Sequence, residues 1–148
     1  MSGKKTIFLI NGPNLNLLGT REVEIYGNLT LKDIEKNSIS KAKEFNMKLE
    51  CYQSNNEGDI VNLIHKYSTY DGLIINPGAY THSSIAIRDA ISGVSIPTIE
   101  IHLSNIHARE EFRKHSFIAP VAIGQISGFG PVSYDLAVLA MFNYLKAK

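Results

Sequence analysis

The chain has 148 residues, of which 44% are hydrophobic and 20% charged, as is typical of one folded soluble domain rather than a disordered segment. Lys and Arg number 15 against 14 Asp and Glu, so the charge balance favours neither a nucleic-acid partner nor an anionic membrane. The single cysteine, Cys51, excludes an internal disulfide and suits a reducing, cytoplasmic compartment.

Short apolar runs alternate with helical patterns in the first half of the chain. Residues 6–10 form a predicted buried strand, and this run is too short for a signal peptide core or a transmembrane helix. Thr30 opens a predicted helix to about residue 45, because Thr30 and Asp33 have the spacing of a capping box. A second strand is expected at residues 49–52 and a second helix at residues 59–67.

The same alternation continues through the second half. Strands are expected at residues 73–75, 98–102 and 121–123, and helices at residues 83–91, 108–115 and 131–145. Five strands alternating with five helices predict an α/β fold, a flavodoxin-like doubly wound five-stranded parallel sheet with helices on both faces. Residues 1–148 would form a single domain, with its ligand at the carboxyl ends of the strands.

Polar side chains gather where four of these strands end. They are Asn11, Asn14 and Asn16 after the first strand, Asn76, Tyr80 and His82 after the third, His102, Ser104 and Asn105 after the fourth, and residues 127–130 after the fifth. Taken singly, each has a structural explanation, because asparagines form turns and a lone histidine is more often structural. Arg109 and Arg113, beside two glutamates, are typical of a solvated helical face. The joint position of all these polar residues at one predicted edge of the sheet nevertheless favours a functional site.

The fourth strand places a carboxylate and an imidazole on one face. Side chains alternate along a strand, so Glu100 and His102 point to the same side of the sheet. Both sides should be covered by helices, and an unpaired buried carboxylate is very costly, so His102 is the expected partner of Glu100. A carboxylate that accepts from one ring nitrogen fixes the tautomer and favours a proton-donating imidazole.

The loop of residues 18–27 contains the most distinctive pair, Arg21 and Tyr26. A free tyrosine, with a pKa of about 10, is a poor base at neutral pH. An arginine beside it is a permanent cation that favours the phenolate. Gly19 and Gly27 flank the pair and could let the loop open and close over a substrate.

Several common sites are missing from the sequence. It contains no phosphate-binding P-loop and no nucleophile elbow, and residues 128–130 lack the third glycine of a dinucleotide motif. His102 and His107 with a nearby glutamate match no established metal spacing, so neither a metal nor a cofactor is expected. Two other interpretations stay open. One is a non-catalytic module that binds phosphate or nucleotide, and the other is a small hydrolase, for which no convincing nucleophile is present.

Motifs along nearly the whole chain resemble one known family, the type II 3-dehydroquinate dehydratases. The similar stretches are residues 11–22, 26–27, 76–84, 86–90, 100–113 and 128–130. One difference is Val23, where the family commonly has proline. The resemblance implies a catalytic domain that converts 3-dehydroquinate to 3-dehydroshikimate through an enolate, in the shikimate pathway of aromatic amino acid biosynthesis. It also implies a dodecamer of four trimers and no metal, cofactor or covalent imine.

The resemblance also implies roles for particular residues. Tyr26, as a phenolate favoured by Arg21, would take the C2 proton. Asn14 would hold an ordered water near the enolate, and His102, oriented by Glu100, would protonate the departing C1 hydroxyl. The implied substrate-binding residues are Asn76, His82, Asp89 from a neighbouring subunit, Leu103, Ser104 and Arg113.

Overall fold

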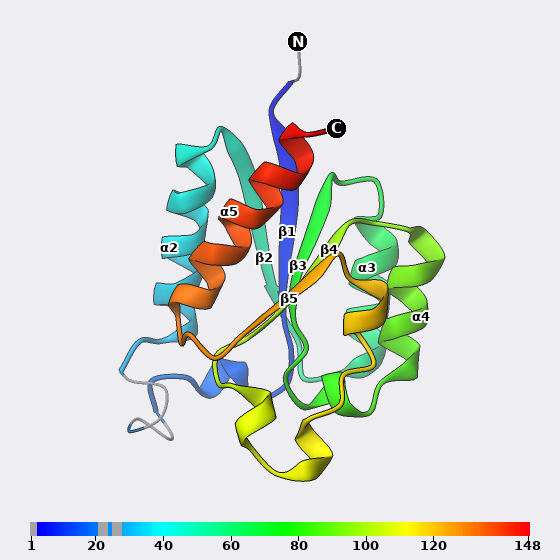
Figure 1. Cartoon of the computed structure of the whole chain (residues 1–148). Helices are drawn as coiled ribbons and strands as arrows, with labels where there is room; N and C mark the ends of the chain where they lie inside the picture. The colour runs from blue at the N-terminus through cyan, green and yellow to red at the C-terminus, as the bar shows by residue number, and fades with distance from the viewer. Residues whose placement is uncertain (1–2, 21–23, 25–27) are drawn as a thin grey trace.

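The computed structural model describes residues 3–20, 24 and 28–148, and these contain a five-stranded parallel sheet (Figure 1). The strands are β1 (Lys5–Asn11), β2 (Met47–Gln53), β3 (Gly72–Asn76), β4 (Thr98–His102) and β5 (Gly124–Ser127). Their order across the sheet is β2-β1-β3-β4-β5, and every neighbouring pair is parallel. The predicted doubly wound sheet is therefore confirmed.

Two helical layers cover the sheet. The four α-helices of the described residues are α2 (Leu31–Glu44), α3 (Glu57–Lys66), α4 (Ile85–Val94) and α5 (Val132–Lys146). Helices α2 and α5 lie on one face, and α3 and α4 lie on the other (Figure 1). Helix α2 begins as predicted, because Thr30 and Asp33 form a complete capping box. Within the described residues, no helix has both the length and the apolarity needed to span a bilayer.

The central strands are apolar along their whole length because both faces are buried. In β1, Ile7 and Leu9 pack in the core beneath α2 and α5, whereas Phe8 and Ile10 pack in the core beneath α3 and α4. This arrangement is typical of parallel sheets, which are covered on both sides. It explains why the first strand shows a continuous apolar run.

Two predicted elements in the last third of the chain are wrong. Residues 108–115 do not form a helix; two 3-10 turns, η3 (Ile106–Ala108) and η4 (Glu111–Arg113), stand there instead. The backbone is extended at Arg109 and Glu110, which prevents one continuous helix. Residues 121–123 are not a strand either, because Val121 ends a 3-10 turn that contains Pro120, and β5 starts at Gly124.

The carboxyl ends of β1 and β3 are joined by a close backbone contact. The Gly12 amide donates to the Asn76 carbonyl oxygen at 2.8 Å. A Cβ atom at position 12 would lie 2.4 Å from the Pro77 carbonyl oxygen, so only glycine fits there. This junction sets the loops that follow the two strands side by side.

Candidate active site

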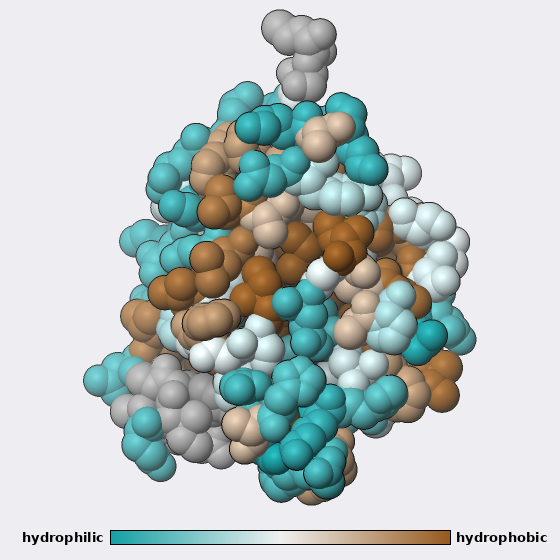
Figure 2. All heavy atoms as spheres, in the orientation of Figure 1, coloured by the Kyte–Doolittle hydropathy of each residue, from teal (hydrophilic) through white to brown (hydrophobic). Residues whose placement is uncertain are grey.

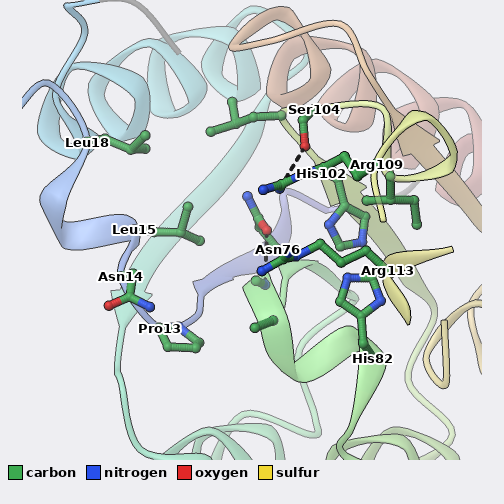
Figure 3. Close-up of a pocket in the computed structure, with 14 residues that line it drawn as sticks. Pro13, Asn14, Leu15, Leu18, Asn76, His82, His102, Ser104, Arg109 and Arg113 are labelled. Carbon is green, nitrogen blue, oxygen red and sulfur yellow. Dashed lines mark hydrogen bonds between the residues drawn. The ribbon is translucent and has the colours of Figure 1, made fainter. Parts of the chain in front are cut away.

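A cavity of about 150 Å³ lies at the carboxyl ends of β1, β3 and β4 (Figure 3). Seven predicted site residues line it together: Asn14, Asn76, His82, His102, Leu103, Ser104 and Arg113. The other lining residues are Pro13, Leu15, Leu18, Gly78, Ala79, Ile106 and Arg109. The structure thus brings together residues that are up to about a hundred positions apart in the sequence, at the edge where a doubly wound sheet binds ligands.

The cavity receives side chains from both faces of the sheet. Side chains alternate along a strand, so Asn76 points to the same side of the sheet as Ile74, which packs beneath α2 and α5. His102 points to the opposite side from its neighbour Ile101, and therefore toward α3 and α4. In Figure 3 both side chains point into the same hollow, with His82 and the two arginines along one wall and Asn14 on the other. A ligand there would be held between the two layers.

Glu100 and His102 form the buried pair that the strand pattern predicts. His102 Nε2 lies 2.5 Å from Glu100 Oε2, and the Glu100 side chain is completely buried. An ionised carboxylate only accepts hydrogen bonds, so Nε2 carries the proton between them. Nδ1 is then the ring nitrogen left for other contacts, and a protonated ring would donate from it.

Two hydroxyl groups complete the surroundings of Glu100. Thr81 Oγ1 donates to Glu100 Oε2 at 2.6 Å, and Ser116 Oγ lies 2.8 Å from Oε1 and 3.0 Å from Oε2. Ser116 Oγ also accepts from the amides of Ile118 and Ala119, so its own proton is directed at the carboxylate. These donors meet the hydrogen-bonding needs of a carboxylate that water cannot reach.

Glu100 is ionised despite its burial. Burial raises the pKa of Glu100, but the hydrogen bond and positive charge of His102, with the bonds from Thr81 and Ser116, outweigh that effect and hold the pKa below its usual value. The result is a fixed negative charge behind the imidazole. That charge fixes the tautomer and the orientation of the His102 ring at the cavity wall.

His82 lies beside this pair, and its pKa is below the ordinary value of a histidine. Its ring is stacked with that of His102 at a centroid distance of 6.4 Å, and its Nδ1 lies 2.8 Å from the His115 carbonyl oxygen. Burial lowers the pKa of His82, and the nearby His102 and Arg113 lower it further, while the His115 carbonyl raises it. A neutral His82 donates from Nδ1 to the carbonyl and presents Nε2 as an acceptor.

Two arginines line this side of the cavity, and both form an ion pair with Glu110. Arg113 Nη1 contacts Glu110 Oε2 at 2.5 Å, and Arg109 Nη1 lies 3.4 Å from Ser104 Oγ. Both arginines line the cavity although the helix predicted to bear them is absent. The two 3-10 turns direct both guanidinium groups inward, where they suit an oxygen-rich or anionic ligand.

Comparison with known proteins shows the family of this chain. The family model described as Dehydroquinase class II matches residues 5–142. This chain belongs to that family. A relative from Trichodesmium erythraeum named 3-dehydroquinate dehydratase is 60% identical over 141 residues, covering 95% of this chain and 94% of the relative. A relative of the same name from Clostridium perfringens (strain 13) is 56% identical over 144 residues, covering 96% and 99%.

Solved structures of class II dehydroquinases have the same fold. The type II dehydroquinase from Butyrivibrio crossotus aligns with a TM-score of 0.90 at 48% identity, covering 95% of this chain and 98% of the other. The enzyme from Propionibacterium acnes aligns with a TM-score of 0.90 at 38% identity, covering 97% and 99%. The expected flavodoxin-like architecture is thereby confirmed as the architecture of this dehydroquinase family.

Four predicted site residues are not among those that line the cavity, and for two of them the structure gives no position. Glu100 lies behind His102 rather than at the cavity wall. Arg21 and Tyr26 lie outside the described residues, as does Val23. Asp89 is exposed on α4 and does not line the cavity of its own chain. Asn14 was predicted either as a site residue or as a turn residue, and the structure is compatible with both. It lines the cavity, and it adopts the left-handed turn conformation with a φ of 70°.

Sequence reasoning missed three residues of this dehydroquinase site. Thr81 in a 3-10 turn and Ser116 in a loop bind Glu100 from 19 and 16 positions away. Nothing in their local sequence distinguishes them from ordinary turn residues. The sequence pattern places Arg109 on a solvated helical face, whereas in the structure it lines the cavity. Within the part of the chain that the structure describes, no three His, Cys, Asp or Glu side chains are grouped so that they could hold a metal ion.

Proposed function

We propose that the protein is a 3-dehydroquinate dehydratase, a hydro-lyase that forms 3-dehydroshikimate in the shikimate pathway. The observation that carries this proposal is the fully buried Glu100 behind His102 at the wall of the cavity. A binding module has no need of a buried carboxylate that orients an imidazole toward its ligand. A hydrolase would need a nucleophile, and the described cavity contains no serine–histidine or cysteine–histidine pair in contact.

The proposed reaction proceeds in two steps. Tyr26, as a phenolate beside Arg21, takes the proton from C2, and the electron pair moves onto the ketone oxygen to form an enolate. Asn14 holds a water that donates to this oxygen, where negative charge develops. The enolate then collapses, the C1–C2 double bond forms, and the C1–O bond breaks. His102 gives its proton to the leaving hydroxyl, which departs as water.

The remaining cavity residues are proposed to bind the substrate. Arg113 and the Leu103–Ser104 segment meet its oxygen atoms through directional hydrogen bonds. His82 accepts from a hydroxyl through Nε2, and the Asn76 amide binds another polar group. Asp89 would act in the cavity of a neighbouring subunit, and its exposed position on α4 supports this.

A direct assay tests the proposal. Purified protein mixed with 3-dehydroquinate should produce a rising ultraviolet absorbance, because the product contains a conjugated enone. A sample of 3-dehydroquinate without protein serves as the control for spontaneous dehydration. If the pure, folded wild-type protein gives no absorbance change, the proposed activity is wrong.

Removal of Arg21 should change how the rate depends on pH. Without the neighbouring cation, the pKa of Tyr26 should return toward the value of about 10 of a free tyrosine. Since the phenolate is the active form, the ascending limb of the kcat/KM profile should move to higher pH in Arg21→Ala. Arg21→Lys, which keeps the charge, should move it less. An identical profile in all three proteins would show that Arg21 does not tune the base.

The proposal includes a cytoplasmic dodecamer of four trimers. An exposed apolar surface supports self-association, since Figure 2 shows apolar atoms gathered over α5, where Val132, Leu136 and Leu139 are exposed. Such a surface is typical of a contact with another subunit. Light scattering should give a mass about twelve times the 16.4 kDa of one chain. A stable monomer with full activity would contradict the assembly and the proposed place of Asp89.

A further inference from the structure

A chain of buried hydrogen bonds leads from the cavity into α5. The Gly78 amide donates to Asn76 Oδ1 at 3.2 Å, Asn76 Nδ2 donates to Tyr134 Oη at 2.9 Å, and the Tyr134 hydroxyl donates to Asn11 Oδ1 at 2.6 Å. Asn11 is fully buried, and Tyr134 and Asn76 are only 1% and 3% exposed. Of these residues, Asn76 and Gly78 line the cavity, whereas Tyr134 lies in the core beneath α2 and α5.

The chain has only one consistent direction. A backbone amide can only donate, so the Gly78 contact identifies the Asn76 atom that faces it as oxygen. The Asn76 nitrogen must then face Tyr134, which accepts from it and gives its own proton to Asn11. Burial raises the pKa of Tyr134 well above its ordinary value, so the hydroxyl keeps the proton that this chain needs. Each member thereby fixes the orientation of the next.

We propose that Tyr134 is a positioning residue that holds the Asn76 amide in the orientation that binds substrate. This inference rests on the proposed function, in which Asn76 contacts 3-dehydroquinate. With one N–H bound to Tyr134 and the oxygen bound to Gly78, the amide has one N–H and one lone pair left for the ligand. The hydroxyl that enforces this choice comes from a helix that contributes no residue to the cavity lining.

Tyr134→Phe isolates the effect of the hydroxyl. The ring and its packing stay, but Asn76 Nδ2 and Asn11 Oδ1 lose their partner in a place that water does not reach. The Asn76 amide then keeps only the contact with the Gly78 amide and is held less firmly in its binding orientation. Since Asn76 would bind the substrate before and during the reaction alike, KM should rise roughly tenfold while kcat stays within about twofold.

A double-mutant cycle with Asn76→Ala tests whether Tyr134 acts through Asn76. In the Asn76→Ala background, Tyr134→Phe should change KM by less than about twofold, because the residue it positions is gone. Tyr144→Phe makes the same chemical change on the same helix, at a half-buried side chain away from the cavity, and should leave both constants unchanged. Equal effects of Tyr134→Phe in both backgrounds would overturn the proposal.

KM also separates positioning from simple destabilisation. A variant that is only less stable contains less folded enzyme, which lowers the apparent kcat at an unchanged KM, and that result would overturn the proposal. If Tyr134→Phe does not fold, Asn11→Ala is the second route, since it removes the acceptor that directs the Tyr134 proton away from Asn76. It should also raise KM, and an unchanged KM would again overturn the proposal. The wild-type assay distinguishes these outcomes from failure of the proposed function, which would show as no turnover at all.

Discussion

Turnover of 3-dehydroquinate should fall about 10²- to 10⁴-fold when His102 is replaced by alanine, the range that a positioned proton donor contributes. Hydroxide is a poor leaving group, so the C1–O bond breaks readily only if the oxygen receives a proton as it departs. The loss should appear in kcat, measured by the absorbance of the enone. His65→Ala removes an exposed histidine near the end of α3 and should leave kcat unchanged.

Glu100→Gln separates the proton donor from the charge behind it. His102→Ala leaves Glu100 buried beside an empty space, so a drop in activity could reflect lost stability. The glutamine variant keeps the shape of the side chain, but its amide group presents N–H to the imidazole or a neutral oxygen in place of a carboxylate. We expect kcat to fall by at least about tenfold at a similar KM. Wild-type kcat in Glu100→Gln would show that the buried charge does not support catalysis.

Replacement of Tyr26 by phenylalanine should remove most turnover and leave ligand binding largely intact. The phenyl ring keeps the size of the side chain but has no oxygen to accept the C2 proton, and no other proposed residue replaces that oxygen. We expect a fall in kcat of at least about 10²-fold, with the dissociation constant of the product changed only slightly, as measured by calorimetry. Near-normal kcat would show that another group is the base.

Arg21→Ala is the appropriate comparison for Tyr26→Phe. Both changes affect the same loop, but only the tyrosine variant removes the reacting oxygen. At high pH the Arg21→Ala protein should regain part of its activity, because the remaining tyrosine can still ionise. The Tyr26→Phe protein should show no such recovery. Equal recovery of both variants at high pH would contradict the assignment of Tyr26 as the base.

Sequence patterns predicted the fold best where both faces of a strand are covered. The predicted bounds of β4 agree with the structure, and the expected alternation placed Glu100 and His102 opposite Ile99 and Ile101. Burial on both sides leaves few residue types possible at each position, so the pattern is easy to read. β5 is different because it lies at the edge of the sheet, where a short sequence of Gly-Gln-Ile-Ser pairs with β4 on one side only. Its apolar content is too low to distinguish it from a turn.

The candidate site was predictable only in part. Residues at strand ends, such as His102 and Asn76, follow from the rule that parallel strands end at one edge. Thr81, Ser116 and Tyr134 do not, because each acts through a contact with a residue 16 to 58 positions away. A hydroxyl in a turn or on a helix has the same appearance in the sequence whether it meets water or a buried carboxylate. Only the packed structure distinguishes the two.

The cavity lies across the sheet edge, with Asn76 projecting from one face and His102 from the other. Neither helical layer therefore holds the whole set of reacting and binding groups. Asn76 is hydrogen-bonded to Tyr134 in the α2 and α5 layer, and Glu100 is hydrogen-bonded to Thr81 and Ser116 on the opposite side. If the proposed site is correct, partial unfolding of either layer should abolish turnover, because each layer would lose groups that the reaction needs.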